Sequence, residues 1–72
     1  MDIAEALRGA MVDSNVNDLE VAIMAGSSQA SVVGWIKGKS NPNAITYQRL
    51  RDKLPGFAAR IDAQNAALLA TG

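Results

Sequence analysis

The fold is decided by residues 17–37, which read NDLEVAIMAGSSQASVVGWIK. Asn17 and Glu20 have the spacing of a capping box, in which each side chain accepts a hydrogen bond from the other's backbone amide at a helix start. Gly26 predicts the end of that helix, because glycine adopts a left-handed backbone without a side-chain clash. Ser28 is a favoured N-cap and predicts a second helix. We therefore expect two short helices joined by a tight turn that contains glycine.

Apolar residues at helical spacing give each of these helices an inward face. We expect that face to consist of Leu19, Ala22 and Ile23 in the first helix, and of Val32, Trp35 and Ile36 in the second, which ends at Gly38. Leu19, Val32 and Trp35 are expected to fill the wedge between the helices. Trp35 is thus expected to be a packing anchor rather than a platform on which bases stack.

Three further helices are predicted outside this segment. The first runs from Asp2 to about Val12, with Ile3, Leu7 and Met11 on one face, and ends in the polar stretch 13–15. The fourth is capped by Asn43, carries Ile45, Leu50 and Leu54, and ends at Pro55-Gly56. The fifth has a stripe of Phe57, Ile61, Gln64 and Leu68, flanked by Ala58 and Leu69. The predicted fold class is all-α, a compact single five-helix domain over residues 1–72, with the helix-turn-helix at about 17–37 and the C-terminal helix at about 56–70.

A chain of 72 residues buries a small core, and such chains often need a disulfide, a metal or a partner subunit. This sequence has no cysteine and no histidine, so oligomerisation is the expected reinforcement. The fifth helix has two interpretations. It completes the core of the monomer, or its stripe of Phe57, Ile61, Leu68 and Leu69 pairs with a second copy to form a homodimer.

The same composition argues against catalysis. Without histidine or cysteine, and with carboxylates scattered over separate faces, the sequence offers no nucleophile with its base and no metal site. We therefore expect neither an enzyme nor a cofactor. The acidic start, Met1 to Glu5, is unlike a signal peptide, and no apolar run reaches the length of a membrane span, so a cytoplasmic protein without membrane contact is expected.

The formal net charge of zero conceals an asymmetry along the chain. Residues 1–36 hold one basic and five acidic side chains, a net charge of −4. Residues 37–72 hold six basic and two acidic side chains, a net charge of +4. This asymmetry has two interpretations. Either the charges are scattered at random and solvated, or one face of the domain is basic and suited to bind phosphate.

The joint spacing of the turn and the segments around it resembles the Cro and phage-repressor helix-turn-helix family, often called XRE. The resemblance covers about residues 3–69. It rests on Leu19, Ala22, Gly26, Ser28, Val32-Val33-Gly34-Trp35, Gly38-Lys39-Ser40-Asn41-Pro42, Leu50 and Leu54. It implies a lambda-repressor-like domain that binds double-stranded DNA as a sequence-specific transcriptional regulator, a repressor or Cro-like protein of phage or prophage origin.

The resemblance implies that the third helix reads bases in the major groove. The positions concerned are Gln29, Ala30, Ser31, Val33 and Gly34. A glutamine amide pairs bidentately with adenine, and Ala30 and Val33 are suited to contact thymine methyl groups. Ser31 suits either a base or a phosphate. Gly34 either allows close approach of the duplex or marks a position without readout.

Phosphate contacts are implied at the edges of this face, where they set the register of the protein on DNA. By the resemblance they fall on Asn17, Ser28, Lys37, Lys39 and Asn41. The two lysines would make binding dependent on salt, whereas Arg49, Arg51 and Lys53 would supply only a favourable field.

Two residues depart from the family pattern. Asp18 stands where the family commonly has a glutamine that touches a phosphate, and its charge would repel one. Ile36 stands where the family often has an exposed charged residue, and with Val33 it would form an apolar pair suited to a protein partner. These departures keep a second class open, a protein-binding relative of the same fold, such as an antirepressor or an antitoxin-like module.

Overall fold

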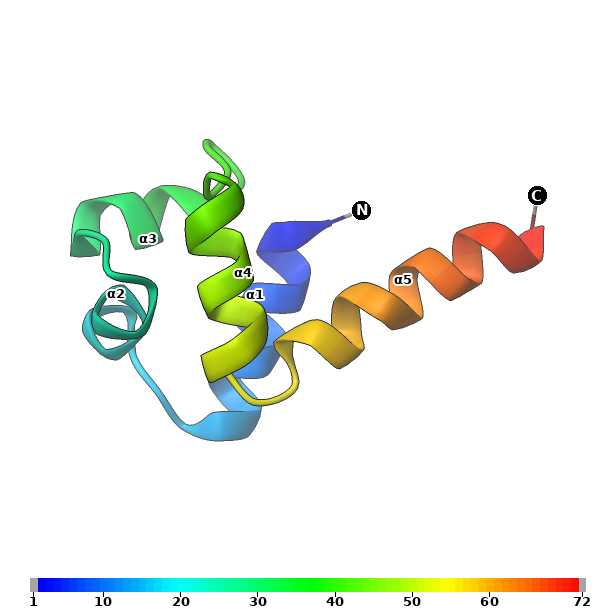
Figure 1. The fold of residues 1–72 in the computed structure, drawn as a ribbon, viewed down its shortest axis with the longest axis horizontal. Helices are drawn as coiled ribbons and strands as arrows, with labels where there is room; N and C mark the ends of the chain where they lie inside the picture. The colour runs from blue at the N-terminus through cyan, green and yellow to red at the C-terminus, as the bar shows by residue number, and fades with distance from the viewer. Residues whose placement is uncertain (1, 72) are drawn as a thin grey trace.

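Five helices follow the segments that the sequence marks as helical (Figure 1). The structure, a computed structural model, describes residues 2–71, and the surroundings of side chains for residues 2–69. The helices are α1 (Ile3–Ser14), α2 (Asp18–Ala25), α3 (Gln29–Ile36), α4 (Ala44–Lys53) and α5 (Phe57–Thr71). No strand occurs among the described residues, so the predicted all-α fold with five helices is confirmed. The two ends of the predicted domain, Met1 and Gly72, lie outside the described residues.

Short-range hydrogen bonds explain why the helices begin where they do. Asn17 Oδ1 accepts from Glu20 N at 2.9 Å and Glu20 Oε1 accepts from Asn17 N at 3.3 Å, which completes the predicted capping box. Ser28 Oγ accepts from Ser31 N at 3.1 Å. Asn43 Oδ1 accepts from Thr46 N at 2.9 Å. These bonds satisfy backbone amides that a helix start leaves without partners.

Left-handed residues end the first two helices. Gly26 has φ 65°, as predicted for the end of α2. The predicted end of the first helix was two residues too early, because the helix runs on to Ser14 and Asn15 takes the left-handed conformation with φ 54°. Asparagine is one of the few residues with a side chain that adopts this conformation readily.

The core is smaller than the apolar pattern suggests. It comprises Ala6, Leu7, Ala10, Val21, Ala22, Ala25, Val32, Trp35, Leu50, Leu54, Phe57 and Ile61. The predicted inward positions Leu19 and Ile23 are wrong, since they are 52% and 74% exposed. In α2 the inward face is instead Val21, Ala22 and Ala25. An eight-residue helix that is apolar nearly all round does not define its own inward face, and packing against α3 and α4 selects it.

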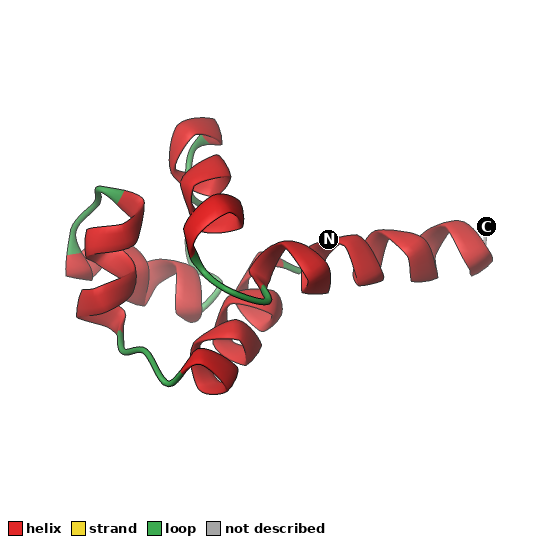
Figure 2. Ribbon diagram, turned by 60° about the horizontal axis from the view of Figure 1, so that its bottom comes forward, coloured by secondary structure: helices red, strands yellow, loops and turns green. Residues whose placement is uncertain are grey.

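The helices form a body from which α5 extends (Figures 1 and 2). α2 packs on α3 and α4, and α1 packs on α3 and α5. α5 buries only its beginning, through Phe57 and Ile61, and its last turns project away from the other helices with Leu68 and Leu69 exposed. The predicted stripe of α5 is therefore divided between the core of this chain and its surface.

Polar contacts hold α5 against the body. Arg60 pairs with Asp13 of α1, and Gln64 both accepts from Asp2 N at 2.7 Å and donates to Asp2 O at 2.9 Å.

None of the described helices is by itself long and apolar enough to cross a bilayer, and only α2 and α3 taken together, across their bend, meet those criteria.

Candidate nucleic-acid interface

The candidate site is built on the bend between α2 and α3. The helix axis changes direction by 110° between the two helices, within the range of helix-turn-helix motifs. Gly26 makes the turn through its positive φ, and Ser27 N donates to Ala22 O at 2.9 Å to close it. Val32 and Trp35, both buried, hold α3 on the body. The helix is thus fixed by one side and leaves the other side free.

The predicted base-reading residues lie on that free side of α3. Gln29 and Ala30 are exposed, and Ser31, Val33 and Gly34 are half-buried. Four of them, Gln29, Ala30, Val33 and Gly34, have the spacing that places residues on one helical face, opposite Val32 and Trp35. The structure therefore brings the predicted readers together in a helix of eight residues that begins at Gln29.

Gly34 has a packing role that the sequence did not reveal. A Cβ at this position would lie 2.6 Å from Ser40 Oγ. The Gly34 carbonyl also accepts from Lys39 N at 2.9 Å and from Ser40 N at 3.4 Å. A side chain at position 34 would therefore force the Ser40 hydroxyl to move, in the loop that folds back on α3.

Asp18, the departure that weighed against DNA binding, has a hydrogen-bonding partner on α3. Gln29 Nε2 donates to Asp18 Oδ1 at 3.2 Å, and Leu19 N donates to the same oxygen at 2.9 Å. The carboxylate of Asp18 and the predicted base reader Gln29 are therefore parts of one exposed hydrogen-bonding unit.

The five predicted phosphate contacts are all exposed: Asn17, Ser28, Lys37, Lys39 and Asn41. Asn17 and Ser28 already cap α2 and α3, so an anion would meet backbone amides of the helix starts together with these side chains. Lys37 and Lys39 form no hydrogen bond or ion pair through their ammonium groups with another described residue. The two lysines are therefore available to counter-charges from outside.

Unlike the two lysines, Arg8 and Arg49 donate hydrogen bonds within the chain. Arg8 Nη1 donates to Ile36 O at 2.7 Å, at the end of α3. Arg49 Nη1 donates to Ala25 O at 3.3 Å, at the end of α2. The last turns of α2 and α3 contain no basic residue of their own, so these arginines supply the cations that favour a helix end.

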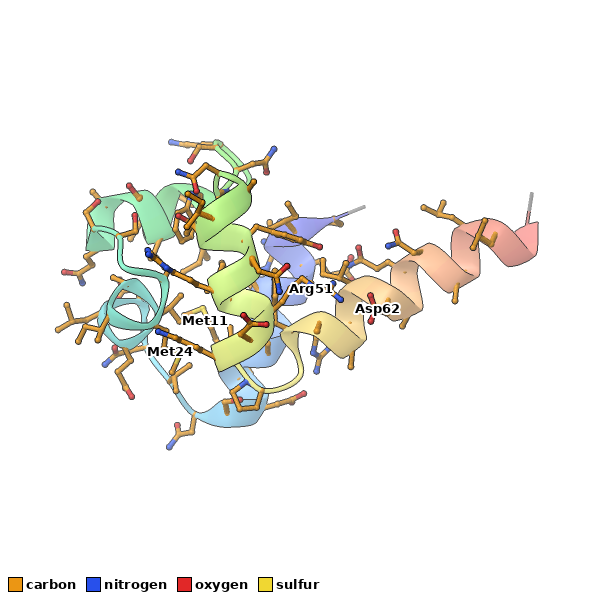
Figure 3. All side chains as sticks on the ribbon, viewed as in Figure 1. Met11, Met24, Arg51 and Asp62 are labelled. Carbon is orange, nitrogen blue, oxygen red and sulfur yellow. The ribbon has the colours of Figure 1, made fainter. Side chains whose placement is uncertain are left out.

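Arg51 and Arg60 are also engaged within the chain. Arg51 pairs with Asp62 at 3.2 Å and lies over the ring of Tyr47 (Figure 3). Hydrogen bonds to the Tyr47 hydroxyl and to Asp62 raise the pKa of Arg51 above its ordinary value. Much of the basic excess of the second half is therefore engaged within the chain, and Lys37 and Lys39 are the basic side chains that the candidate phosphate surface retains.

Other sites are poorly developed. Among the described residues no group of three histidine, cysteine, aspartate or glutamate side chains is placed to hold a metal ion. A shallow groove between α1 and α5 is lined by Glu5, Ala6, Arg60, Ala63 and Gln64. Its Arg60 and Gln64 already bind Asp13 and Asp2.

No family model, curated protein or solved structure matches this chain.

Proposed function

We propose that this chain is a sequence-specific DNA-binding transcriptional regulator of the Cro and phage-repressor type, which acts in the cytoplasm and reads the major groove with α3. The observation that carries the proposal is the α2–turn–α3 unit. Its second helix is held to the body by Val32 and Trp35, and its free side presents Gln29 and Ala30. The bend of 110° is that of motifs in which the second helix lies in a major groove and the first helix crosses the backbone.

Electrostatics support the same orientation. Lys37 and Lys39 follow α3 directly and are free to meet phosphates on one side of the groove. Ser28 and the amides that open α3 lie at the other end of the helix. Phosphate contacts at both ends would fix the register while the side chains between them read bases.

The test is selection of bound fragments from random duplex DNA at near-physiological salt, with the full chain. We expect enrichment of a motif with at least one invariant adenine, the base for which Gln29 is suited. Recovery of no enriched motif, from a chain shown to be folded by circular dichroism, would reject the proposal.

A second candidate function is binding of a protein partner, and one observation favours it. Leu19 and Ile23 lie one turn apart on α2 and are 52% and 74% exposed, so they are a better apolar pair for a partner than the predicted Val33 and Ile36. Ile36 packs against the core, and its replacement would disturb the fold. If no DNA motif is selected, loss of a defined partner complex in Ile23→Lys, with Ile45→Lys as a control of equal charge, would support this alternative.

We also propose that the regulator is a homodimer joined through α5. The projecting turns carry Leu68 and Leu69, which are 60% and 83% exposed, and no charged residue follows Asp62. Isolated helical turns are unstable in water without tertiary packing, and a second copy would supply it. The two α3 helices would then read half-sites about 34 Å apart.

A further inference from the structure

A hydrogen bond joins the first residue of α2 to the first residue of α3. Gln29 Nε2 donates to Asp18 Oδ1 at 3.2 Å. Asp18 is itself held in place, because the same oxygen accepts from Leu19 N at 2.9 Å and the residue opens a helix with a complete capping box. The exposed Gln29 amide is thus hydrogen-bonded to a carboxylate that the backbone itself holds.

We infer that Asp18 is a positioning residue that fixes the amide of Gln29 for adenine while lowering the affinity of the chain for DNA in general. The inference rests on the proposed function and deepens it. By this inference Asp18 supports the recognition of DNA, although its negative charge by itself argues against DNA binding.

The orientation follows from the donor and acceptor properties of the two side chains. A carboxylate only accepts, so it must face the nitrogen of the amide and not its oxygen. The Gln29 amide then retains one N–H and its carbonyl for a base edge. Adenine presents the complementary acceptor N7 and donor N6–H in the major groove, whereas guanine presents two acceptors. Without Asp18 the amide is free to turn over by 180° and to present its two groups in the opposite order.

The charge of Asp18 acts on every DNA sequence alike. Asp18 opens α2, next to Asn17, where the resemblance implies a phosphate contact. A carboxylate on the order of 6 Å from a phosphate in water weakens binding by about threefold at low salt, without regard to sequence. The same residue would therefore sharpen the discrimination between sites and reduce non-specific binding.

The test uses the full chain and the duplex selected from the random pool, resynthesised with each of the four base pairs at every position. Dissociation constants are measured for the wild type, Asp18→Ala and Asp18→Asn on these duplexes and on an unrelated duplex. In Asp18→Ala the preference for adenine at the position read by Gln29 should fall by about three- to tenfold, the usual value of one hydrogen bond. Its affinity for the unrelated duplex should rise by about threefold. In Asp18→Asn, donation from Leu19 N should hold the side-chain oxygen, and not the nitrogen, toward Gln29, so this variant should keep the preference for adenine and show the same general rise.

A matched pair elsewhere in the chain supplies the control. Gln48 Nε2 donates to Asp52 Oδ1 at 2.9 Å on the surface of α4. Asp52→Ala removes the same charge and the same type of bond away from α3, and should leave the preference for adenine unchanged. Thermal unfolding establishes that each variant is folded.

The outcomes separate the inference from the proposed function. A wild type that selects no motif overturns both. A wild type that selects a motif, while Asp18→Ala keeps the full preference for adenine, overturns the inference alone. The inference alone is also overturned if Asp18→Asn loses as much of the preference for adenine as Asp18→Ala, because a positioning role predicts rescue by the acceptor oxygen. Unchanged affinity for the unrelated duplex in both Asp18 variants overturns the part of the inference that concerns charge.

Discussion

At the scale of single residues, Gly26 satisfies two requirements at once. Its φ of 65° is costly for any residue with a side chain. A Cβ there would also lie 2.6 Å from Arg49 Nη1, the group that caps the end of α2. Gly56 has φ 85° but no atom within 4 Å of a Cβ. The two glycines therefore share the backbone requirement and differ only in the neighbouring arginine.

Gly26→Ala should destabilise the protein more than Gly56→Ala. The left-handed backbone should cost each variant about 1–2 kcal/mol, and in Gly26→Ala the displacement of Arg49 from Ala25 O adds to it. Urea unfolding measures both free energies. Equal losses would show that Arg49 moves aside without cost.

Gln29→Ala tests base reading directly. The variant should lose about 1–3 kcal/mol of affinity for the selected site, the value of a bidentate base contact, and keep its affinity for unrelated DNA. Gln29 is exposed, so its removal should leave stability unchanged. Gln48→Ala is the matched control, because Gln48 is also exposed and also donates to an aspartate. A uniform loss of affinity on all duplexes would exclude base reading by Gln29.

At the scale of helices, the basic residues separate into two groups. Arg8 and Arg49 donate to carbonyls at the ends of α3 and α2, where the helix dipole and unpaired carbonyls favour a cation. Lys37 and Lys39 stand after α3 and are exposed. The arginines are expected to matter for stability, and the lysines for binding.

Lys39→Ala and Arg49→Met should therefore have opposite phenotypes. Lys39→Ala should weaken binding to all duplexes and reduce the slope of log affinity against log salt concentration by about one unit, with unchanged stability. Arg49→Met should lower the free energy of unfolding by about 1 kcal/mol through loss of the hydrogen bond to Ala25 O, and leave the salt slope unchanged. Titrations at several salt concentrations measure the slopes. A reduced slope in Arg49→Met would place that arginine on the phosphate surface.

At the scale of the whole molecule, stability depends on a few buried side chains. Trp35, 5% exposed, and the fully buried Phe57 are the largest members of the core. At about 0.05–0.15 kcal/mol per residue, a chain of this length has a total stability of about 4–11 kcal/mol. The free energy lost through a single large cavity is therefore a large fraction of the total stability.

Trp35→Ala should lower the free energy of unfolding by about 3–5 kcal/mol. Ile45→Ala is the informative comparison, because Ile45 is a large apolar residue that is 65% exposed. It should change the free energy of unfolding by less than about 0.5 kcal/mol. A loss above about 2 kcal/mol in Ile45→Ala would mean that this residue is buried after all.

Leu69→Lys tests the proposed dimer. A charge on the projecting part of α5 should shift the protein toward the monomer in sedimentation equilibrium, because a buried unpaired ammonium is costly. Ile23→Lys introduces the same charge on α2 and should leave the dimer intact. A wild type that is monomeric at all concentrations would refute the dimer, and dissociation of both variants would place the interface elsewhere.

The sequence by itself determined the local features of this protein. The capping box of Asn17, the N-caps Ser28 and Asn43, and the turn at Gly26 were predicted because each depends on hydrogen bonds or backbone preferences within a few residues. The number and order of the helices follow from these stops and starts. The predicted readers on α3 also share a face by helical spacing alone, although their contact with DNA remains a prediction.

Only the tertiary structure decided which faces are buried and which charges are used. α2 is apolar nearly all round, so its contacts with α3 and α4 selected Val21 and Ala25 over Leu19 and Ile23. The arginine caps and the bond between Asp18 and Gln29 join residues 11 or more positions apart. Such contacts depend on how the helices cross, and helix crossing is set by packing among all five helices rather than by any local pattern.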